Sequence, residues 1–168
     1  MWTAVLCLLF SSAYAYNLNI SDPHAQIYFS PNGGAQQSLV NTIGQARESV
    51  YVQAYSFTSA PIAKALVDAH NRGVKVEAIL DKSQRKATYT GATFLRNEGI
   101  PVWIDAAHAI AHNKVMVIDG QTVVTGSFNF TKAAEEKNAE NLLIIRDSGL
   151  AKLYRENWEK HQQHSEEY

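Results

Sequence analysis

HNKVMVID, at residues 112–119, is followed one short turn later by GSFN at residues 126–129. The first run predicts a β-strand. Because side chains of a strand alternate between its two faces, Lys114 would lie on the same face as His112 and as the apolar residues two and four positions later. Asp119-Gly120 is a strong turn signal, so we expect residues 113–119 and 122–125 to pair as a β-hairpin. This hairpin would place an imidazole, an ammonium, a hydroxyl and an amide close to one another.

Segments typical of strands and of helices alternate on both sides of this hairpin. Further strands are predicted at residues 25–29, 49–57, 74–80, 101–104 and 139–146, and helices at residues 35–48, 59–71, 91–97, 131–137 and 148–161. This alternation predicts an α/β fold in which a mixed β-sheet is sandwiched between helices. The tail QQHSEEY is polar, and we expect it to be frayed.

The polar residues of the two runs have both a structural and a functional interpretation. A lysine beside an apolar row is unexpected unless it meets an anion, but it is also typical of an edge strand that is protected against aggregation. Ser127 and Asn129 are able to donate hydrogen bonds to a phosphate, and they are equally suited to a hydrogen-bonded turn before a helix. Each run taken alone leaves both interpretations open.

The chain of 168 residues has the size of one domain, and its formal net charge is −1, so any nucleic-acid binding must come from a local basic patch.

The first fifteen residues, MWTAVLCLLFSSAYA, carry no charged side chain and end in the A-x-A pattern of a secretory signal peptide. We expect cleavage after Ala15, with residues 16–168 as a single domain; an uncleaved membrane anchor and a buried helix are the alternatives. Cys7, the only cysteine, would be removed with the signal. A thiol-free exported protein suits a bacterial periplasm or the medium, and after processing we expect no stable association with a membrane.

Together, H-x-K-x4-D-G followed by G-S-x-N resembles the signature of the phospholipase D superfamily, and the match is close from Ala111 to Thr131. The small size, the expected export signal and the single motif are similar to the superfamily's secreted bacterial Nuc-type endonuclease branch. The resemblance implies that residues 16–168 form one phospholipase D-like catalytic domain. It also implies that His112 is the nucleophile that forms a phosphohistidine, or the general acid. Lys114 and Asn129 would bind the nonbridging phosphate oxygens, and Ser127 would support the site.

Two carboxylates receive supporting roles from the same resemblance. Asp119 is the aspartate of the motif, and we expect it to be structural at the hairpin turn rather than in contact with phosphate. Glu140 fits the place where family members carry a carboxylate behind the histidine. There it would fix the tautomer of the imidazole and raise its basicity.

The single copy of the motif predicts a homodimer. Displacement at phosphorus is in line, so one imidazole cannot both attack and protonate the leaving oxygen on the far side. No second H-x-K-x4-D is present, because residues 70–72 read HNR, with arginine in place of lysine. A twofold dimer would supply the second imidazole by symmetry, as the resemblance also implies. We interpret the sequence as lacking H-x-x-H, H-E-x-x-H and paired aspartate clusters, and paired lysines and asparagines would stabilise the transition-state charge instead. We therefore expect neither a metal ion nor another cofactor.

Lys82, Arg85 and Lys86 crowd the loop after a predicted central strand, either as a solvated loop or as a clamp on a phosphate backbone. Tyr89 would stack on bases, and His108 would border the site. We therefore predict a metal-independent phosphodiesterase, an endonuclease that hydrolyses DNA, and RNA as a second substrate, with little sequence specificity. A lipid phosphodiesterase of the phospholipase D type and a non-catalytic nucleic-acid-binding module are the alternatives.

Overall fold

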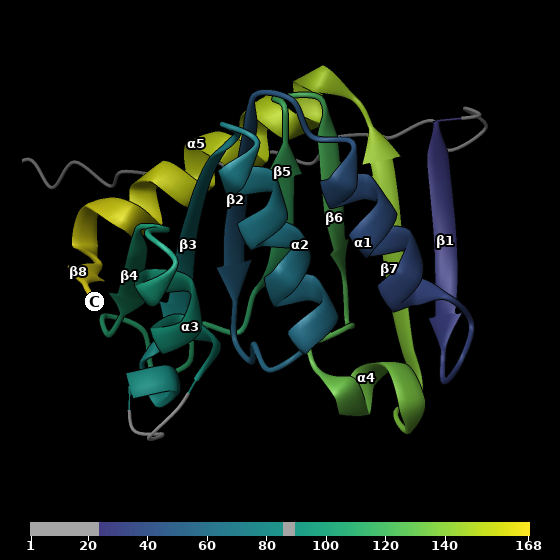
Figure 1. Cartoon of the computed structure of the whole chain (residues 1–168), viewed down its shortest axis with the longest axis horizontal. Helices are drawn as coiled ribbons and strands as arrows, with labels where there is room; N and C mark the ends of the chain where they lie inside the picture. Colours follow the sequence, from purple (N-terminus) through teal and green to yellow (C-terminus); the bar gives the residue numbers. More distant parts are fainter. Residues whose placement is uncertain (1–23, 86–89) are drawn as a thin grey trace, which may run out of the picture.

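The computed structural model describes residues 24–85 and 90–168, and within them eight strands form one mixed β-sheet (Figure 1). The strand order across the sheet is β1-β7-β6-β5-β2-β3-β4-β8. The strands are β1 (Ala25–Ser30), β2 (Ser49–Ala54), β3 (Lys75–Asp81), β4 (Val102–Asp105), β5 (Lys114–Ile118), β6 (Thr122–Gly126), β7 (Glu140–Arg146) and β8 (Glu166–Glu167). The mixed-sheet α/β prediction is therefore confirmed.

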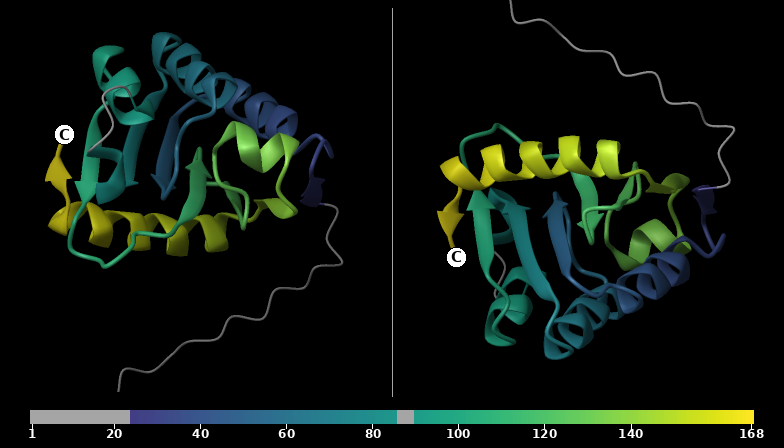
Figure 2. Two further views of the ribbon diagram at one scale, coloured as in Figure 1. Left: turned by 90° about the horizontal axis from the view of Figure 1, so that it is seen from below. Right: turned by 90° about the horizontal axis from the view of Figure 1, so that it is seen from above.

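Helices cover both faces of this sheet, as the views along its edge show (Figure 2). The helices α1 (Ala35–Gly44), α2 (Ala60–Asn71) and α3 (Gly91–Asn97) lie on one face, and α5 (Ser148–His164) crosses the other. The short helix α4 (Lys132–Glu136) connects β6 to β7, and a 3-10 turn, η1 (Lys82–Arg85), follows β3. Trp158 fixes α5 in place, because its buried indole N–H donates to the carbonyl oxygen of Val52 at 2.8 Å.

The alternation of the HNKVMVID run distributes its side chains between two cores. Met116 and Ile118 belong to the large core under α1 and α2, whereas Val115 and Val117 pack with Ala151 of α5. A strand that is buried on both faces needs apolar residues at every position. The polar residues His112 and Lys114 therefore stand out at its beginning.

Strand directions bring several chain segments to one end of the sheet. β2, β3 and β4 are parallel, while β5, β6 and β7 are each antiparallel to the strand before them in the order β2-β5-β6-β7. The carboxyl ends of β2, β3 and β6 consequently meet the amino ends of β5 and β7 at the lower end of the sheet in Figure 1. Both halves of the sequence motif lie at this end.

The prediction of a frayed C-terminal tail is wrong. Helix α5 continues to His164, and Glu166–Glu167 then form β8 beside β4. Tyr168 donates its backbone N–H to Val102 and packs its ring against the large core. A two-residue strand has no periodicity of its own, so its pairing with a distant strand is invisible in the local sequence.

Two of the sequence predictions fall outside the described residues. The expected signal peptide lies within residues 1–23, and Lys86 and Tyr89 lie within residues 86–89. In the remainder of the chain, no helix combines the length and the apolar character needed to cross a membrane.

Candidate active site

His112 lies at the lower end of the sheet, two residues before the start of β5, and its side chain is exposed. Its ring is 4.7 Å from the ring of Tyr55, centroid to centroid, and Tyr55 follows directly after β2. In the described part of the chain, the imidazole nitrogens make no hydrogen bond. The ring is therefore held by packing, with its nitrogens open to a ligand.

Lys114 begins β5, where it is paired with Ala54 of β2, and its side chain is only 6% exposed. The ammonium donates to the carbonyl oxygen of His112 at 2.8 Å and lies 5.3 Å from the ring centroid of Tyr55. Burial lowers the pKa of Lys114, and the negative charge of Glu140 offsets this only in part. An ammonium has three N–H donors, so two remain for a bound anion.

The GSFN run begins at the last residue of β6 and brings Asn129 and Ser127 to the same end of the sheet. The side-chain oxygen of Asn129 is buried without a hydrogen-bond partner among the described residues. A half-turn of this amide would present its NH2 group to the same space. Such an unsatisfied group is costly in a finished core and is suited to a bound ligand. Ser127 is exposed, and its hydroxyl accepts from the backbone N–H of Asn141 at 3.1 Å.

Glu140 begins β7, and its carboxylate accepts from the side-chain amide of Asn138 at 3.2 Å. Its negative charge favours the charged form of Lys114 and raises the pKa of that lysine, against the larger effect of burial. No hydrogen bond joins Glu140 to His112 within the described residues. The carboxylate expected behind the histidine therefore faces the lysine in this single chain.

Asp119 lies at the opposite end of β5 from His112. Its backbone is left-handed, with φ of 53°, and its carboxylate accepts backbone N–H groups from Arg47, Glu48 and Ser49 at 2.8–3.2 Å. These bonds tie the β5–β6 turn to the segment that enters β2. The carboxylate is thus occupied by backbone donors, away from the other motif residues.

The basic loop lies beside the segment that leads to His112. Asp81 accepts one backbone N–H from Ser83 and another from Ala111, each at 2.8 Å. Burial opposes the charge of Asp81, but these hydrogen bonds and the nearby Lys82 outweigh it and lower its pKa. Lys82 donates to the carbonyl oxygen of His108 at 2.9 Å, and Arg85 is paired with Glu166. A phosphate would have to compete with Glu166 for Arg85.

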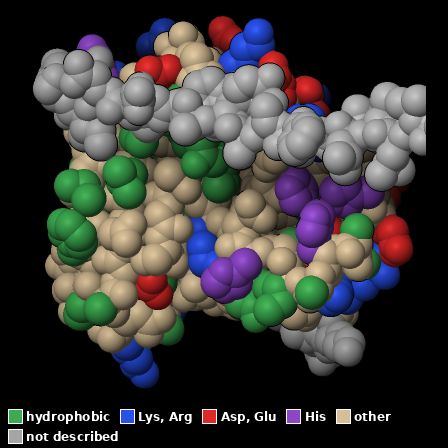
Figure 3. Space-filling model, turned by 180° about the vertical axis from the view of Figure 1, so that it is seen from behind, with side chains coloured by type: hydrophobic (Ala, Val, Ile, Leu, Met, Phe, Trp, Pro, Cys, Tyr) green, Lys and Arg blue, Asp and Glu red, His purple; other side chains and the backbone are tan. Residues whose placement is uncertain are grey.

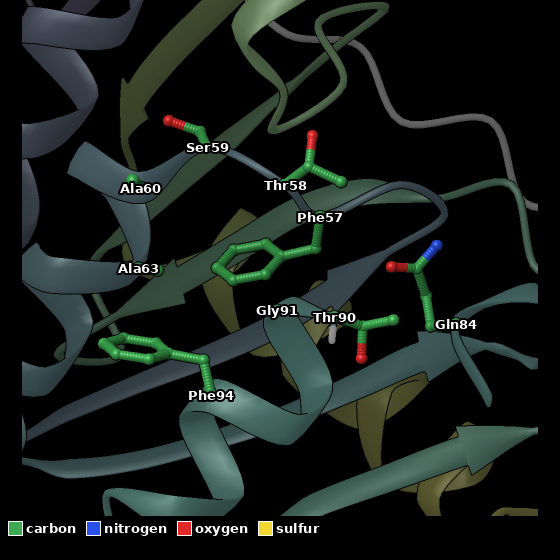
Figure 4. A pocket seen from close by; sticks show the side chains of 9 residues that line it. All are labelled: Phe57, Thr58, Ser59, Ala60, Ala63, Gln84, Thr90, Gly91 and Phe94. Atoms are coloured by element: carbon green, nitrogen blue, oxygen red, sulfur yellow. The ribbon is translucent and has the colours of Figure 1, made fainter. Parts of the chain in front are cut away.

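An apolar cavity of about 410 Å³ opens between α2 and α3 (Figure 4). The aromatic rings of Phe57 and Phe94 line it, together with the polar side chains of Gln84 and Thr90. Phe57 contacts Phe130, the residue after Asn129, at 6.3 Å between ring centroids. The cavity thus adjoins the segment that carries the candidate amide, and no local sequence pattern predicted it.

A cluster of histidines surrounds Asp105, and it was not predicted from the sequence. Asp105 is fully buried at the end of β4, and His108, His161 and His164 surround its carboxylate. Burial opposes the charge of Asp105, but hydrogen bonds from these imidazoles hold its pKa well below the usual range. His161 and His164 form an H-x-x-H spacing, so the interpretation that the sequence lacks this metal-binding pattern is wrong.

An α/β domain with the H-x-K-x4-D run at the start of a central strand defines a class of phosphodiesterases, and comparison with known proteins identifies the family. Residues 39–162 match the family described as "Cardiolipin synthase, PLD-like domain". A phospholipase D of Rickettsia conorii is 44% identical over 144 residues, which span 85% of this chain and 72% of the relative. A mitochondrial cardiolipin hydrolase of Xenopus laevis is 34% identical over 138 residues, or 82% of this chain and 62% of the relative. The chain therefore belongs to the phospholipase D superfamily, a superfamily of phosphodiesterases.

Solved structures agree with this assignment. Nuc from Salmonella typhimurium, a phospholipase D family member, superimposes with a TM-score of 0.82 at 38% identity, over 88% of this chain and 99% of that one. NucT from Helicobacter pylori gives a TM-score of 0.80 at 28% identity, over 86% and 98% of the two chains. The predicted family and its Nuc-like fold are thereby confirmed.

Proposed function

We propose that this protein is a metal-independent endonuclease that hydrolyses DNA, and RNA as a second substrate, with little sequence specificity. The observation that carries the proposal is the exposed imidazole of His112 beside the buried ammonium of Lys114, which has two N–H donors to spare. The unpartnered amide oxygen of Asn129 marks a third polar group at the same end of the sheet. A phosphodiester is the ligand that suits all three groups.

The chemistry follows from in-line displacement. One His112 imidazole nitrogen bonds to phosphorus as the P–O3′ bond breaks, and His112 of the partner subunit protonates the departing O3′. The partner's His112 then takes a proton from water, whose oxygen displaces the histidine and leaves a 5′-phosphate. Lys114 and Asn129 hold the nonbridging oxygens while charge develops on them.

The second subunit is part of this proposal, and an uncovered apolar surface supports it. Ile27 and Phe29 of β1 are 54% and 62% exposed, and Leu143 of β7, directly opposite Ile27, is half-buried on the same face. Figure 3 shows apolar side chains gathered at this edge of the molecule. Phe29 pairs with Asn141, whose N–H donates to Ser127, so the surface adjoins the candidate site. A twofold contact here would bring two copies of His112 toward one phosphate.

A lipid phosphodiesterase is the second candidate. The apolar cavity lined by Phe57 and Phe94 favours it, because an acyl chain fits an apolar cleft. The matched relatives named phospholipase D and mitochondrial cardiolipin hydrolase point the same way. The charge-free export-like segment at residues 1–15 supports action in the periplasm or the medium for either substrate.

The decisive experiment incubates the purified protein with supercoiled plasmid and, separately, with phosphatidylcholine vesicles, both in EDTA. We expect the plasmid to be nicked and linearised while the lipid is unchanged. The His112→Ala variant should lose at least about a thousand-fold in rate, as removal of a nucleophile does, with an unchanged circular dichroism spectrum. Lipid hydrolysis without nicking would replace the nuclease by the second candidate. Loss of nicking under chelation that excess Mg²⁺ restores, at a temperature where the protein remains folded, would contradict the metal-independent mechanism.

A further inference from the structure

Four side chains with metal-binding atoms converge at the end of α5, on the face shown in Figure 3. Asp105 ends β4, His108 follows it in the next loop, and His161 and His164 lie one turn apart on α5. One donor atom from each lies within 4.8 Å of all the others. Two segments that are distant in sequence, residues 105–108 and residues 161–164, thus contribute to one point in space.

The three distances from Asp105 to the imidazoles are close to those of a tetrahedral zinc site. An oxygen of Asp105 lies 2.9 Å from Nδ1 of His108, 2.9 Å from Nδ1 of His161 and 3.4 Å from Nε2 of His164. Zinc–nitrogen bonds of about 2.0–2.1 Å in a tetrahedron separate neighbouring donors by about 3.3 Å. Small side-chain rotations would therefore suffice to place an ion between the four groups.

Hydrogen bonding alone does not account for this arrangement. One carboxylate oxygen offers about two lone-pair sites, yet this oxygen of Asp105 faces three imidazole nitrogens. The other oxygen accepts the backbone N–H groups of Ala107 and His108 at 3.1 and 3.3 Å and lies 3.1 Å from the same Nδ1 of His108. Five nitrogens thus compete for about four lone-pair sites of the carboxylate. A cation in the centre resolves the excess, because each neutral imidazole then offers a lone pair instead of a proton.

We propose that Asp105, His108, His161 and His164 bind a structural divalent cation, with Zn²⁺ as the best match. Nitrogen and carboxylate donors in a four-coordinate set suit zinc, and four protein ligands leave no open position for a substrate. The site is separate from His112 and supplies no group to the proposed hydrolysis.

The ion would fasten α5 to the loop that leads to the candidate nucleophile. His108 is four residues before His112, its carbonyl oxygen holds Lys82, and Ala111 is held by Asp81. The loop is thus anchored at its end by Asp81 and at its beginning by the cluster. Removal of the ion should loosen this loop and the end of α5 without removing a reacting group.

The test uses untagged protein, since a histidine tag would bind zinc by itself. After chelation and dialysis, Zn²⁺ is titrated in competition with a chromophoric chelator. We expect one ion per chain with a Kd tighter than about micromolar, as is typical of structural zinc. His161→Gln and His164→Gln should each weaken binding by at least about a hundred-fold, since even outer-shell changes reach that range. The matched control His70→Gln, in α2 and outside the cluster, should bind like the wild type.

A second measurement needs no variant. Co²⁺ added to the wild-type protein should produce the intense visible absorption of a four-coordinate ion, and Zn²⁺ should abolish it. Zn²⁺ should also raise the Tm of the wild type and of His70→Gln but not that of His161→Gln. Binding weaker than micromolar, or equal binding by the cluster variants, would overturn the proposal. These readouts are independent of hydrolysis, so they stand whether or not the protein cleaves DNA.

Discussion

At the scale of single residues, Lys114 shows how a candidate site conflicts with stability. Its ammonium is buried, and its one hydrogen bond goes to a backbone carbonyl two residues away. Removing a charge from water is costly unless an opposite charge compensates it, and Glu140 does so only in part. A residue that costs stability in the free protein is expected to stabilise something that the free protein lacks.

Replacement of Lys114 by methionine tests whether the ammonium destabilises the free protein and serves to bind the substrate. Lys114→Met keeps the length of the side chain and removes the charge, so Tm should be no lower than in the wild type, while kcat/KM on plasmid falls about 10²–10³-fold. Thermal melts and initial rates measure the two effects. A large loss of Tm would show that the ammonium stabilises the free fold, which would contradict the anion-binding role.

The pH dependence of the same variant gives an independent check. The folded-state pKa of Lys114 lies below the ordinary 10.5, so the unfolded chain binds this proton more tightly. Wild-type stability relative to Lys114→Met should therefore rise with pH between the lowered pKa and about 10.5. Denaturant melts at a series of alkaline pH values measure this difference, and a gap that stays constant would contradict the shift.

Asp119 is expected to contribute stability without contributing to turnover. Asp119→Ala removes the acceptor of three backbone N–H groups and should lower the free energy of unfolding by about 2 kcal/mol or more. Asp119→Asn is the matched control, because asparagine tolerates the left-handed backbone and keeps one acceptor oxygen. Its loss should be smaller. Both variants should hydrolyse plasmid at the wild-type rate per folded molecule at low temperature; a fall in rate without a fall in stability would assign Asp119 to the chemistry.

At the scale of elements, the C-terminal segment pairs with the sheet and packs against it. Tyr168 donates its backbone N–H to Val102, and its hydroxyl is 3.0 Å from that of Thr93 in α3. Tyr168→Ala should therefore lower the free energy of unfolding by about 1–2 kcal/mol. Glu167→Ala, at the exposed neighbouring position, should stay within about 0.5 kcal/mol of the wild type. Urea melts of the two variants measure the difference, and equal stabilities would show that the end of the chain contributes nothing.

Local patterns predicted the elements that carry their own periodicity. The HNKVMVID run with its Asp-Gly turn predicted β5, and the period of two along a strand predicted the separation of Met116 from Val117. Ser59 before Pro61 predicted the start of α2. Contacts between residues that are distant in sequence could not be predicted from local patterns. β8 depends on a partner strand about sixty residues away, and the histidine cluster joins His108 to His161 across a similar separation. Only the H-x-x-H spacing on α5 gave a local hint of the cluster.

At the scale of the whole molecule, the question is whether one chain or two form the site. A single chain presents one exposed His112 at the end of the sheet, and in-line displacement needs a group on each side of the phosphorus. The apolar surface of Ile27, Phe29 and Leu143 lies on the same side of the molecule as α5 and adjoins Ser127. Phe29→Asp would place a charge in this surface, whereas Gln26→Asp places the same charge on the opposite face of the same strand.

Mixed dimers separate a shared site from two independent ones. When wild-type and His112→Ala chains are unfolded together, refolded and assayed at constant total protein, a shared site needs two intact imidazoles. Activity should then follow the square of the wild-type fraction, with roughly one quarter of full activity in an equal mixture rather than one half. In analytical ultracentrifugation, Phe29→Asp should sediment as a monomer and Gln26→Asp as a dimer. In the plasmid assay, Phe29→Asp should have little activity and Gln26→Asp should stay active. A linear dependence on the wild-type fraction, or an active Phe29→Asp monomer, would mean that one chain supplies both the nucleophile and the acid. The acid would then be another group near His112.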